Sequence, residues 1–141
     1  MAEFLVPDMI VYVCTNCIPK GARLPHQWKQ DGCQVLLREV PCSGKTDLQY
    51  LMHAIEGGCR GACVVTCPEG DCRLAQGNYR AEIRIRTIQR LLAEIGMESA
   101  RAELLHCPAD KPLEHLQELI RGAVARICAL GANPICAACG N

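Results

Sequence analysis

Short hydrophobic runs alternate along this chain with longer amphipathic stretches. The short runs are rich in β-branched residues and bounded by glycine, proline or cysteine, which is typical of buried strands. They cover residues 9–13, 34–40, 61–66 and 102–106. The stretch between the first two runs contains Pro19, Gly21 and Pro25. We therefore expect a loop there, with one helical turn around residues 26–30.

The longer stretches carry apolar residues three and four positions apart, which predicts amphipathic helices. Thr46 and Gln49 have the spacing of a capping box, and the stripe that follows closes at Gly57. A second stripe ends at Gly96 after a turn at residues 77–78, and a third begins near Pro112 and reaches Gly131. Three helices are therefore expected.

Alternating strands and helices predict an α/β fold: a single-domain, open, mostly parallel four-stranded sheet flanked by helices. We expect one domain over residues 1–134 and a cysteine-containing tail over residues 135–141. Parallel strands end at a common edge, and open α/β sheets bind ligands beyond the carboxyl ends of their strands. Loops that follow the strands should therefore carry the function.

Cysteine is unusually frequent, with twelve in 141 residues. This is the range of disulfide scaffolds in short secreted proteins. However, the first eight residues include the acids Glu3 and Asp8 where a signal peptide carries cations, and no run is long enough to span a membrane. We expect a cytoplasmic protein, in which closely spaced cysteines are more often metal ligands or redox thiols than structural disulfides.

Charge and aromatic content exclude another class of function. Lysine plus arginine equals aspartate plus glutamate, 15 each, and aromatic residues make up 4% of the chain. Nucleic-acid binding requires a basic surface or stacking platforms, so we expect no nucleic-acid partner. Half of the residues are hydrophobic, which is enough for a core without a structural metal.

Six cysteines, Cys107 among them, follow directly on predicted strand ends, and the other five have spacings that suit a metal centre. They are Cys14 and Cys17 in a C-x2-C, Cys42 in a Pro-Cys-Ser-Gly turn, and Cys67 and Cys72 in a C-x4-C. A four-ligand site would leave one of these five thiols spare.

The other cysteines divide into two groups. Cys63 has an interior strand position and is expected in the core, and Cys33 and Cys128 are expected to be structural. The remaining thiols stay open between packing and a second cluster or ion: Cys59, Cys107, Cys136 and Cys139.

Three chemistries compete for the main site. Four thiolates would satisfy zinc, but structural zinc usually holds together a module that lacks its own core. A thioredoxin-like dithiol would use Cys14 and Cys17 and leave the other three unexplained. An iron–sulfur cluster takes four cysteines from several loops. A thiol–disulfide redox protein and a zinc-binding interaction protein therefore remain the alternatives to an iron–sulfur protein.

Three sequence segments resemble the delta (iron–sulfur) subunit of methyl-viologen-reducing (F420-non-reducing) hydrogenase. These are Val-Pro-Cys-Ser-Gly-Lys at 40–45, the C-x4-C with Gly-Asp at 67–72, and Gly-Asn-Tyr-Arg-Ala-Glu at 77–82. The resemblance covers roughly residues 8–108, and the five strand-end cysteines fall on the family's characteristic positions. The chain departs from the family at residues 68–69, which are Pro-Glu rather than His-Pro, and in its additional cysteines, Cys59, Cys63, Cys107, Cys136 and Cys139.

The resemblance implies a cytosolic electron-transfer subunit with a [2Fe-2S] cluster. It would relay electrons between a hydrogenase or similar donor and the flavin- and iron–sulfur-containing subunit of a heterodisulfide reductase complex that performs electron bifurcation. The residues themselves show no arrangement of nucleophile, base and oxyanion donors. We therefore expect the chain to catalyse no reaction on its own, so that an oxidoreductase activity would belong to the complex.

Overall fold

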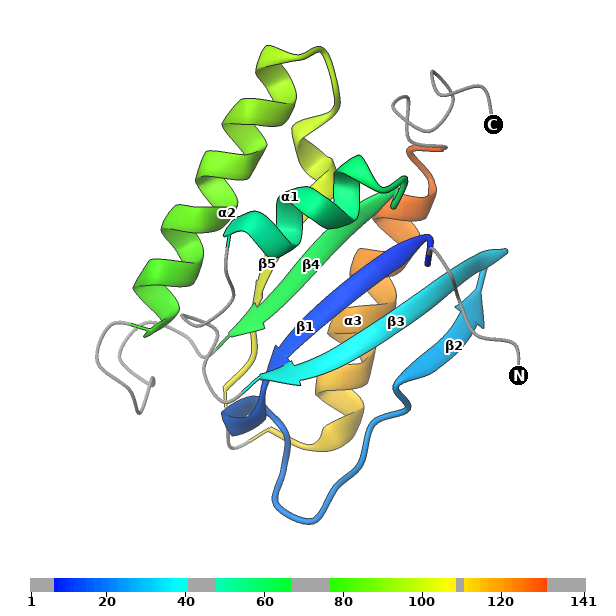
Figure 1. Ribbon diagram of the computed structural model, residues 1–141. Helices are drawn as coiled ribbons and strands as arrows, with labels where there is room; N and C mark the ends of the chain where they lie inside the picture. The colour runs from blue at the N-terminus through cyan, green and yellow to red at the C-terminus, as the bar shows by residue number, and fades with distance from the viewer. Residues whose placement is uncertain (1–6, 41–47, 67–76, 109–110, 132–141) are drawn as a thin grey trace.

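A computed structural model describes residues 7–40, 48–66, 77–108 and 111–131. Within these residues, a five-stranded sheet has the strand order β2-β3-β1-β4-β5 (Figure 1). The strands are β1 (Met9–Cys14), β2 (Gln27–Gln30), β3 (Cys33–Val40), β4 (Gly61–Thr66) and β5 (Ala102–His106). Strands β3, β1, β4 and β5 are parallel, and β2 pairs antiparallel with β3 at one edge.

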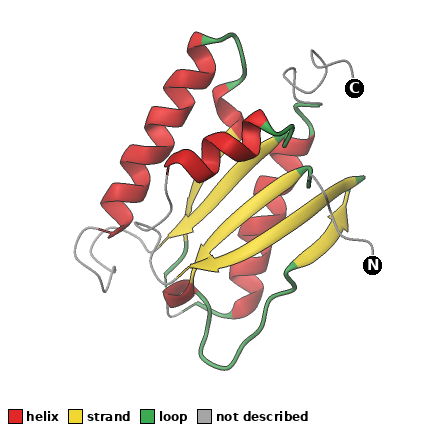
Figure 2. Cartoon of the chain, in the orientation of Figure 1, coloured by secondary structure: helices red, strands yellow, loops and turns green. Residues whose placement is uncertain are grey.

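Helices cover both faces of this sheet. The helices α1 (Leu48–Glu56) and α2 (Gly77–Glu94) lie on one face and α3 (Leu113–Cys128) lies on the other (Figures 1 and 2). Two short 3-10 helices, η1 (Thr15–Cys17) and η3 (Ser99–Arg101), follow β1 and precede β5. In the part of the chain that the structure describes, no helix is both long and apolar enough to cross a membrane.

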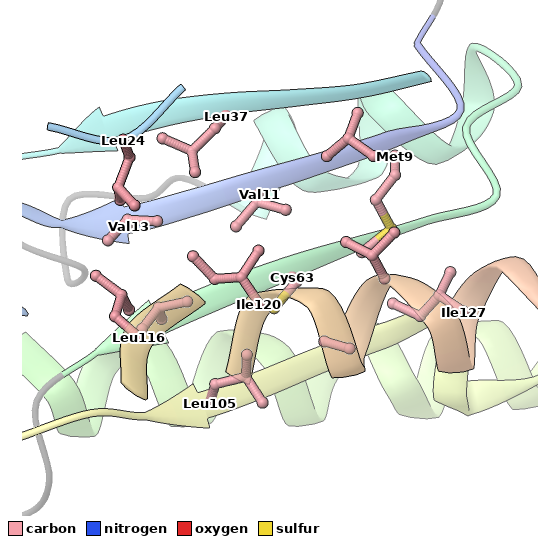
Figure 3. Close-up of a cluster of buried hydrophobic side chains, with 14 of the residues drawn as sticks. Met9, Val11, Val13, Leu24, Leu37, Cys63, Leu105, Leu116, Ile120 and Ile127 are labelled. Carbon is pink, nitrogen blue, oxygen red and sulfur yellow. The ribbon is translucent and has the colours of Figure 1, made fainter. Parts of the chain in front are cut away.

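The central strands are hydrophobic because both of their faces are buried. Every residue of β4 is buried, and alternate side chains enter different cores. Ala62 and Val64 pack with α1 and α2, whereas Cys63 and Val65 pack with α3. Figure 3 shows the second of these cores, with side chains of the sheet facing those of α3. This two-sided burial confirms the predicted α/β class.

The prediction of four strands was wrong by one, because residues 27–30 form β2 rather than a helical turn. Alternate residues of β2 are exposed, as expected for an edge strand. The strand turns into β3 through Asp31 and Gly32, whose φ angles are 52° and 81°. Asp-Gly with two positive φ values is the typical two-residue hairpin turn. This dipeptide was the sequence signal for β2, and the prediction overlooked it.

The other elements lie close to their predicted positions. Strands 61–66 and 102–106 are confirmed to the residue, and β1 and β3 each extend by one cysteine, Cys14 and Cys33. Helix α2 begins at Gly77, where a turn was expected. The predicted helix start at Thr46 and the tail 135–141 lie outside the described residues.

Cys33 and Cys128 form a disulfide. Their Cα atoms are 6.7 Å apart, and 95 positions separate them in the sequence. The bond joins the first residue of β3 to the last residue of α3, so it fastens this helix to the sheet. Both residues are structural, as predicted, but the sequence analysis did not predict that they pair.

Candidate metal centre

The carboxyl ends of the four parallel strands meet at one edge of the sheet, which we call the carboxyl edge. The chain runs from β1 to β3 on one side and later returns to β4 on the other side of β1. Strand β1 is thus the point where the strand order reverses. Loops at such a point diverge and leave a crevice, which is where open α/β sheets bind their ligands.

Cys14 and Cys17 lie at this reversal point. Cys14 is the last residue of β1, and Cys17 ends the 3-10 turn η1 that follows. The N–H of Ile18 donates to the carbonyl of Thr15 at 3.2 Å and closes the turn. Each thiol-bearing residue is 1% exposed and belongs to the buried cluster under α3. The fold therefore presents the C-x2-C as two neighbouring buried thiols.

Three of the five predicted site residues, Cys42, Cys67 and Cys72, lie outside the described residues. The structure does describe the ends of the two strands that precede Cys42 and Cys67. Val40 pairs with Cys14 in the β1–β3 register, and Thr66 ends β4. Cys42 lies two positions after Val40, and Cys67 directly follows Thr66. The chain therefore leaves the described sheet beside Cys14 at both points.

Cys107 is a further thiol at the carboxyl edge. It directly follows β5, is 1% exposed, and its N–H donates to the carbonyl of Thr66 at 2.9 Å. It belongs to the same buried cluster as Cys14 and Cys17. The sequence predicted Cys107 directly after a strand end but left its role open between packing and ligation, and the structure confirms this position.

The surroundings of Cys63 and Cys59 favour the protonated thiol. Cys63 is fully buried in the middle of β4, and burial, with a smaller contribution from nearby Glu103, raises its pKa strongly. The Cys59 thiol donates to the carbonyl of Pro7 at 3.0 Å, and burial and the charge of Asp8 raise its pKa to about 12. Metals bind the thiolate, so neither environment favours ligation. The predicted core position of Cys63 is confirmed.

Cys59 and Cys107 lie at opposite ends of the sheet. Cys59 precedes β4 by two residues, whereas the N–H of Cys107 donates to the carbonyl of Thr66, the last residue of that strand. The six residues of β4 rise about 3.3 Å each, so roughly 20 Å separates the two ends. A second cluster that uses both thiols is incompatible with this separation. Cys136 and Cys139 lie outside the described residues.

The described donors fit an iron–sulfur cluster as part of its ligand set. Buried sulfur pairs suit soft metals, and an apolar shell reduces access of water to them. Between residues 7 and 131, apart from the gaps given above, no group of three or more histidine, cysteine, aspartate or glutamate residues could hold a metal ion. The pair Cys14 and Cys17 therefore forms a partial site, and any complete site needs thiols from other strand ends.

Comparison with known proteins identifies the family. The family model "Methyl-viologen-reducing hydrogenase, delta subunit" matches residues 9–131. The chain belongs to this delta-subunit family. Its match extends beyond residues 8–108, where the sequence motifs indicated the resemblance, and takes in all of α3. Cys107 lies inside both ranges.

Curated relatives of the delta subunit are named as iron–sulfur subunits. The iron–sulfur subunit of F420-non-reducing hydrogenase from Archaeoglobus profundus is 30% identical over 105 residues, which cover 74% of this chain and 77% of the relative. The iron–sulfur subunit of the vhu F420-non-reducing hydrogenase from Methanococcus maripaludis is 30% identical over 136 residues, covering 96% and 98%.

A third relative is much longer than this delta-subunit chain. It is one of the subunits of ferredoxin:CoB-CoM heterodisulfide reductase from Methanosarcina mazei, and it is 28% identical over 100 residues. The match covers 70% of this chain but 13% of that protein. A segment similar to the delta subunit therefore forms part of a heterodisulfide reductase protein.

Proposed function

We propose that this delta-subunit chain binds a [2Fe-2S] cluster at the carboxyl edge and transfers single electrons. Four ligands would be drawn from the strand-end thiols Cys14, Cys17, Cys42, Cys67 and Cys72. The observation that carries the proposal is the pair of buried thiols, Cys14 and Cys17, at the point where the strand order reverses. The names of the relatives, which are iron–sulfur subunits, support it.

The protein's own residues would set the cluster's environment. A bound [2Fe-2S] cluster supplies a one-electron redox couple, whose potential depends on hydrogen bonding, charge and solvent exposure. Cys14 and Cys17 would provide thiolates from a short turn, which holds them at a fixed separation. Ile18 and Leu113 pack against the buried cluster that contains these thiols and reduce access of water.

The proposed partners are a hydrogenase or similar electron donor and the flavin-containing subunit of a heterodisulfide reductase complex. The relative from Methanosarcina mazei supports the second partner, because it contains a similar segment within a heterodisulfide reductase protein. Fusion of two functional units in one chain is compatible with their association as separate chains. We propose that this relay operates in the cytoplasm as part of an electron-bifurcating assembly.

The test is the metal content and spectrum of the full chain, purified without oxygen. We expect a brown protein with about two iron and two sulfide per chain, and a rhombic EPR signal after reduction. A colourless protein that contains zinc would favour the zinc-binding alternative. A metal-free protein with an active Cys14–Cys17 dithiol would favour the thiol–disulfide alternative. Either result would end the proposal.

Serine substitution at each of the five thiols then identifies the ligands. We expect four of the replacements to lower the iron content and one to leave it unchanged. Cys63→Ser is the matched control, because this thiol is equally buried but lies within β4 and has a strongly raised pKa. Loss of iron from a folded Cys63→Ser variant would contradict the assignment of Cys63 to the core.

A further inference from the structure

We propose that a cavity between β2, β3 and α3 binds a small carboxylate that carries an apolar group of about the size of a benzene ring. The cavity has a volume of about 150 Å³. Its apolar lining comes from the loop before β2, from two strands and from the helix, and consists of Leu24, Pro25, Trp28, Leu37 and Ile120. The site uses none of the cysteines, so it does not depend on the proposed cluster.

The floor of the cavity belongs to the buried core. Leu24, Leu37 and Ile120 are 2–6% exposed and form part of the cluster packed under α3. Trp28 packs against this cluster and pairs with Val35, which also belongs to it. Side chains of directly paired residues lie on the same face of a sheet, so the indole lies on the α3 side. An apolar cavity of about 150 Å³ is large enough for benzene, so one ring or branched aliphatic group fits.

Two hydrogen bonds connect the walls of the cavity. The indole N–H of Trp28 donates to Oε1 of Gln30 at 3.2 Å, and Nε2 of Gln30 donates to the carbonyl of Arg121 at 3.0 Å. Edge strand β2 is thereby joined to α3, 91 positions along the chain. The single polar atom of the indole is satisfied, so Trp28 offers the cavity apolar surface. A cavity formed before binding lowers the entropy that a ligand loses its affinity to.

Two polar side chains of α3, Gln117 and Arg121, complete the lining. They are four positions apart and therefore lie on the same face of the helix, one turn from each other. Gln117 is half-buried and Arg121 is exposed. Within the described residues, neither side chain has a hydrogen-bond or salt-bridge partner. Both can therefore donate to a ligand without breaking an existing contact.

The charge of the lining favours an anion. Of the described residues that line the cavity, Arg121 is a cation and none is aspartate or glutamate. A guanidinium binds a carboxylate through two parallel hydrogen bonds, and the amide of Gln117 can donate a third. An apolar carboxylate matches both parts of the lining. A neutral apolar molecule would match the floor alone, and acetate would match the polar side chains alone.

The experiment is equilibrium dialysis of the full chain, purified without oxygen, against four probes. Phenylacetate represents a free acid and N-acetylphenylalanine represents the carboxyl-terminal residue of a peptide. Phenylacetamide lacks the charge and acetate lacks the ring. We expect one acid to bind per chain. Phenylacetamide should bind about fivefold more weakly than phenylacetate, the upper end for an exposed ion pair, and acetate at least about tenfold more weakly. The tighter of the two acids indicates the source of the ligand.

Trp28 locates the bound acid, because it is the one tryptophan in the chain. Its fluorescence should change in a saturable way, with the same dissociation constant that dialysis gives. Arg121→Gln should weaken phenylacetate about fivefold and leave phenylacetamide unchanged. Arg86→Gln is the matched control, since Arg86 is also exposed but lies on α2, across the sheet. Leu24→Phe should weaken both probes, because its larger ring occupies part of the cavity.

Three results would overturn the proposal: no saturable binding of either acid, binding without a change in Trp28 fluorescence, or equal binding by Arg121→Gln and Arg86→Gln. If Leu24→Phe does not fold, Arg121→Gln decides, because residue 121 is exposed and Gln30 contacts its backbone carbonyl whichever side chain it carries. Iron content is measured on the same samples. A chain without iron ends the proposed function and leaves this test intact, since no cysteine lines the cavity among the described residues.

Discussion

Gly61 begins β4 at a position that leaves no room for a side chain. A methyl group added at Gly61 would overlap the carbonyl oxygen of Arg101 and lie 2.6 Å from Cγ2 of Ile127. The first obstacle is backbone and the second is a fully buried core side chain. Position 61 therefore requires glycine because a side chain would not fit, and not because of the backbone conformation.

We predict that Gly61→Ala lowers the free energy of unfolding by about 1–3 kcal/mol, the usual effect of overpacking a core. Gly122→Ala is the matched control. Its added methyl group would lie 3.3 Å from the flexible end of Arg126, and it lies inside α3, where alanine is favoured over glycine by up to about 1 kcal/mol. Urea unfolding of both variants tests the contrast, and equal stabilities would contradict it.

Arg101 connects three elements at the amino edge of the sheet. It is 1% exposed, and its Nη1 donates to the carbonyls of Arg60 at 2.9 Å and Gly131 at 3.1 Å, while Nη2 donates to Leu130 at 3.3 Å. Its Nε also donates to Glu98 at 2.7 Å. The guanidinium therefore satisfies carbonyls after α3, where a cation also complements the helix dipole.

The pKa of Glu98 is lowered, first by a hydrogen bond from its own backbone and then by the bond from Arg101. The hydrogen bond from Arg101 therefore favours the charged form of the Glu98 carboxylate. Because Glu98 is exposed, the greater part of the stabilisation by Arg101 should come from the three partly buried carbonyls.

We predict that Arg101→Met lowers the free energy of unfolding by about 2 kcal/mol, because it leaves three partly buried carbonyls without their donor. Arg101→Lys should recover part of this loss, since one ammonium cannot reproduce the planar donor set. Arg86→Met is the control, because Arg86 is exposed and pairs with Glu82 on the surface of α2, where such pairs contribute about 0–1 kcal/mol. In thermal unfolding, the melting temperature should fall most for Arg101→Met, less for Arg101→Lys and least for Arg86→Met. A loss for Arg101→Met no larger than that for Arg86→Met would refute the role of Arg101.

At the scale of the whole molecule, six of the seven described cysteines lie at one or the other end of the parallel strands, and Cys63 lies between them. Cys14, Cys17 and Cys107 lie at the carboxyl edge, whereas the disulfide of Cys33 and Cys128 closes the chain at the other. A bond across 95 positions restricts the unfolded chain strongly. The stabilising disulfide and the proposed redox site therefore lie at opposite ends of the parallel strands.

We predict that reduction of this disulfide lowers the free energy of unfolding by about 2–4 kcal/mol. Cys33→Ser should unfold at the same lower temperature with or without a thiol reductant, whereas Cys59→Ser should respond to the reductant as the original chain does. Mass spectrometry after alkylation of free thiols shows whether Cys33 and Cys128 are joined or reduced in each sample. The visible spectrum of the proposed cluster should be unaffected by the reduction, and identical melting of the oxidised and reduced original chain would contradict the prediction.

Local patterns were sufficient to predict the parallel strands. β4 was predicted to the residue because it is a continuous and fully buried run, and β5 was also predicted to the residue although it contains Glu103 and His106 and is only partly buried. β2 was missed because Gln27–Gln30 is a polar edge strand whose conformation depends on pairing with β3. The parallel direction of the main strands followed from their alternation with helices, which also predicted that Cys14 and Cys17 would lie at the carboxyl edge.

The sequence by itself determined the α/β class, the core position of Cys63 and the family, because these depend on periodicity, burial and motif spacing along the chain. Only the tertiary structure decided that β1 is the point of reversal and that Cys33 meets Cys128. The physical reason is that strand order and register bring together residues far apart in sequence. No local preference of a cysteine specifies which other strand will lie beside it.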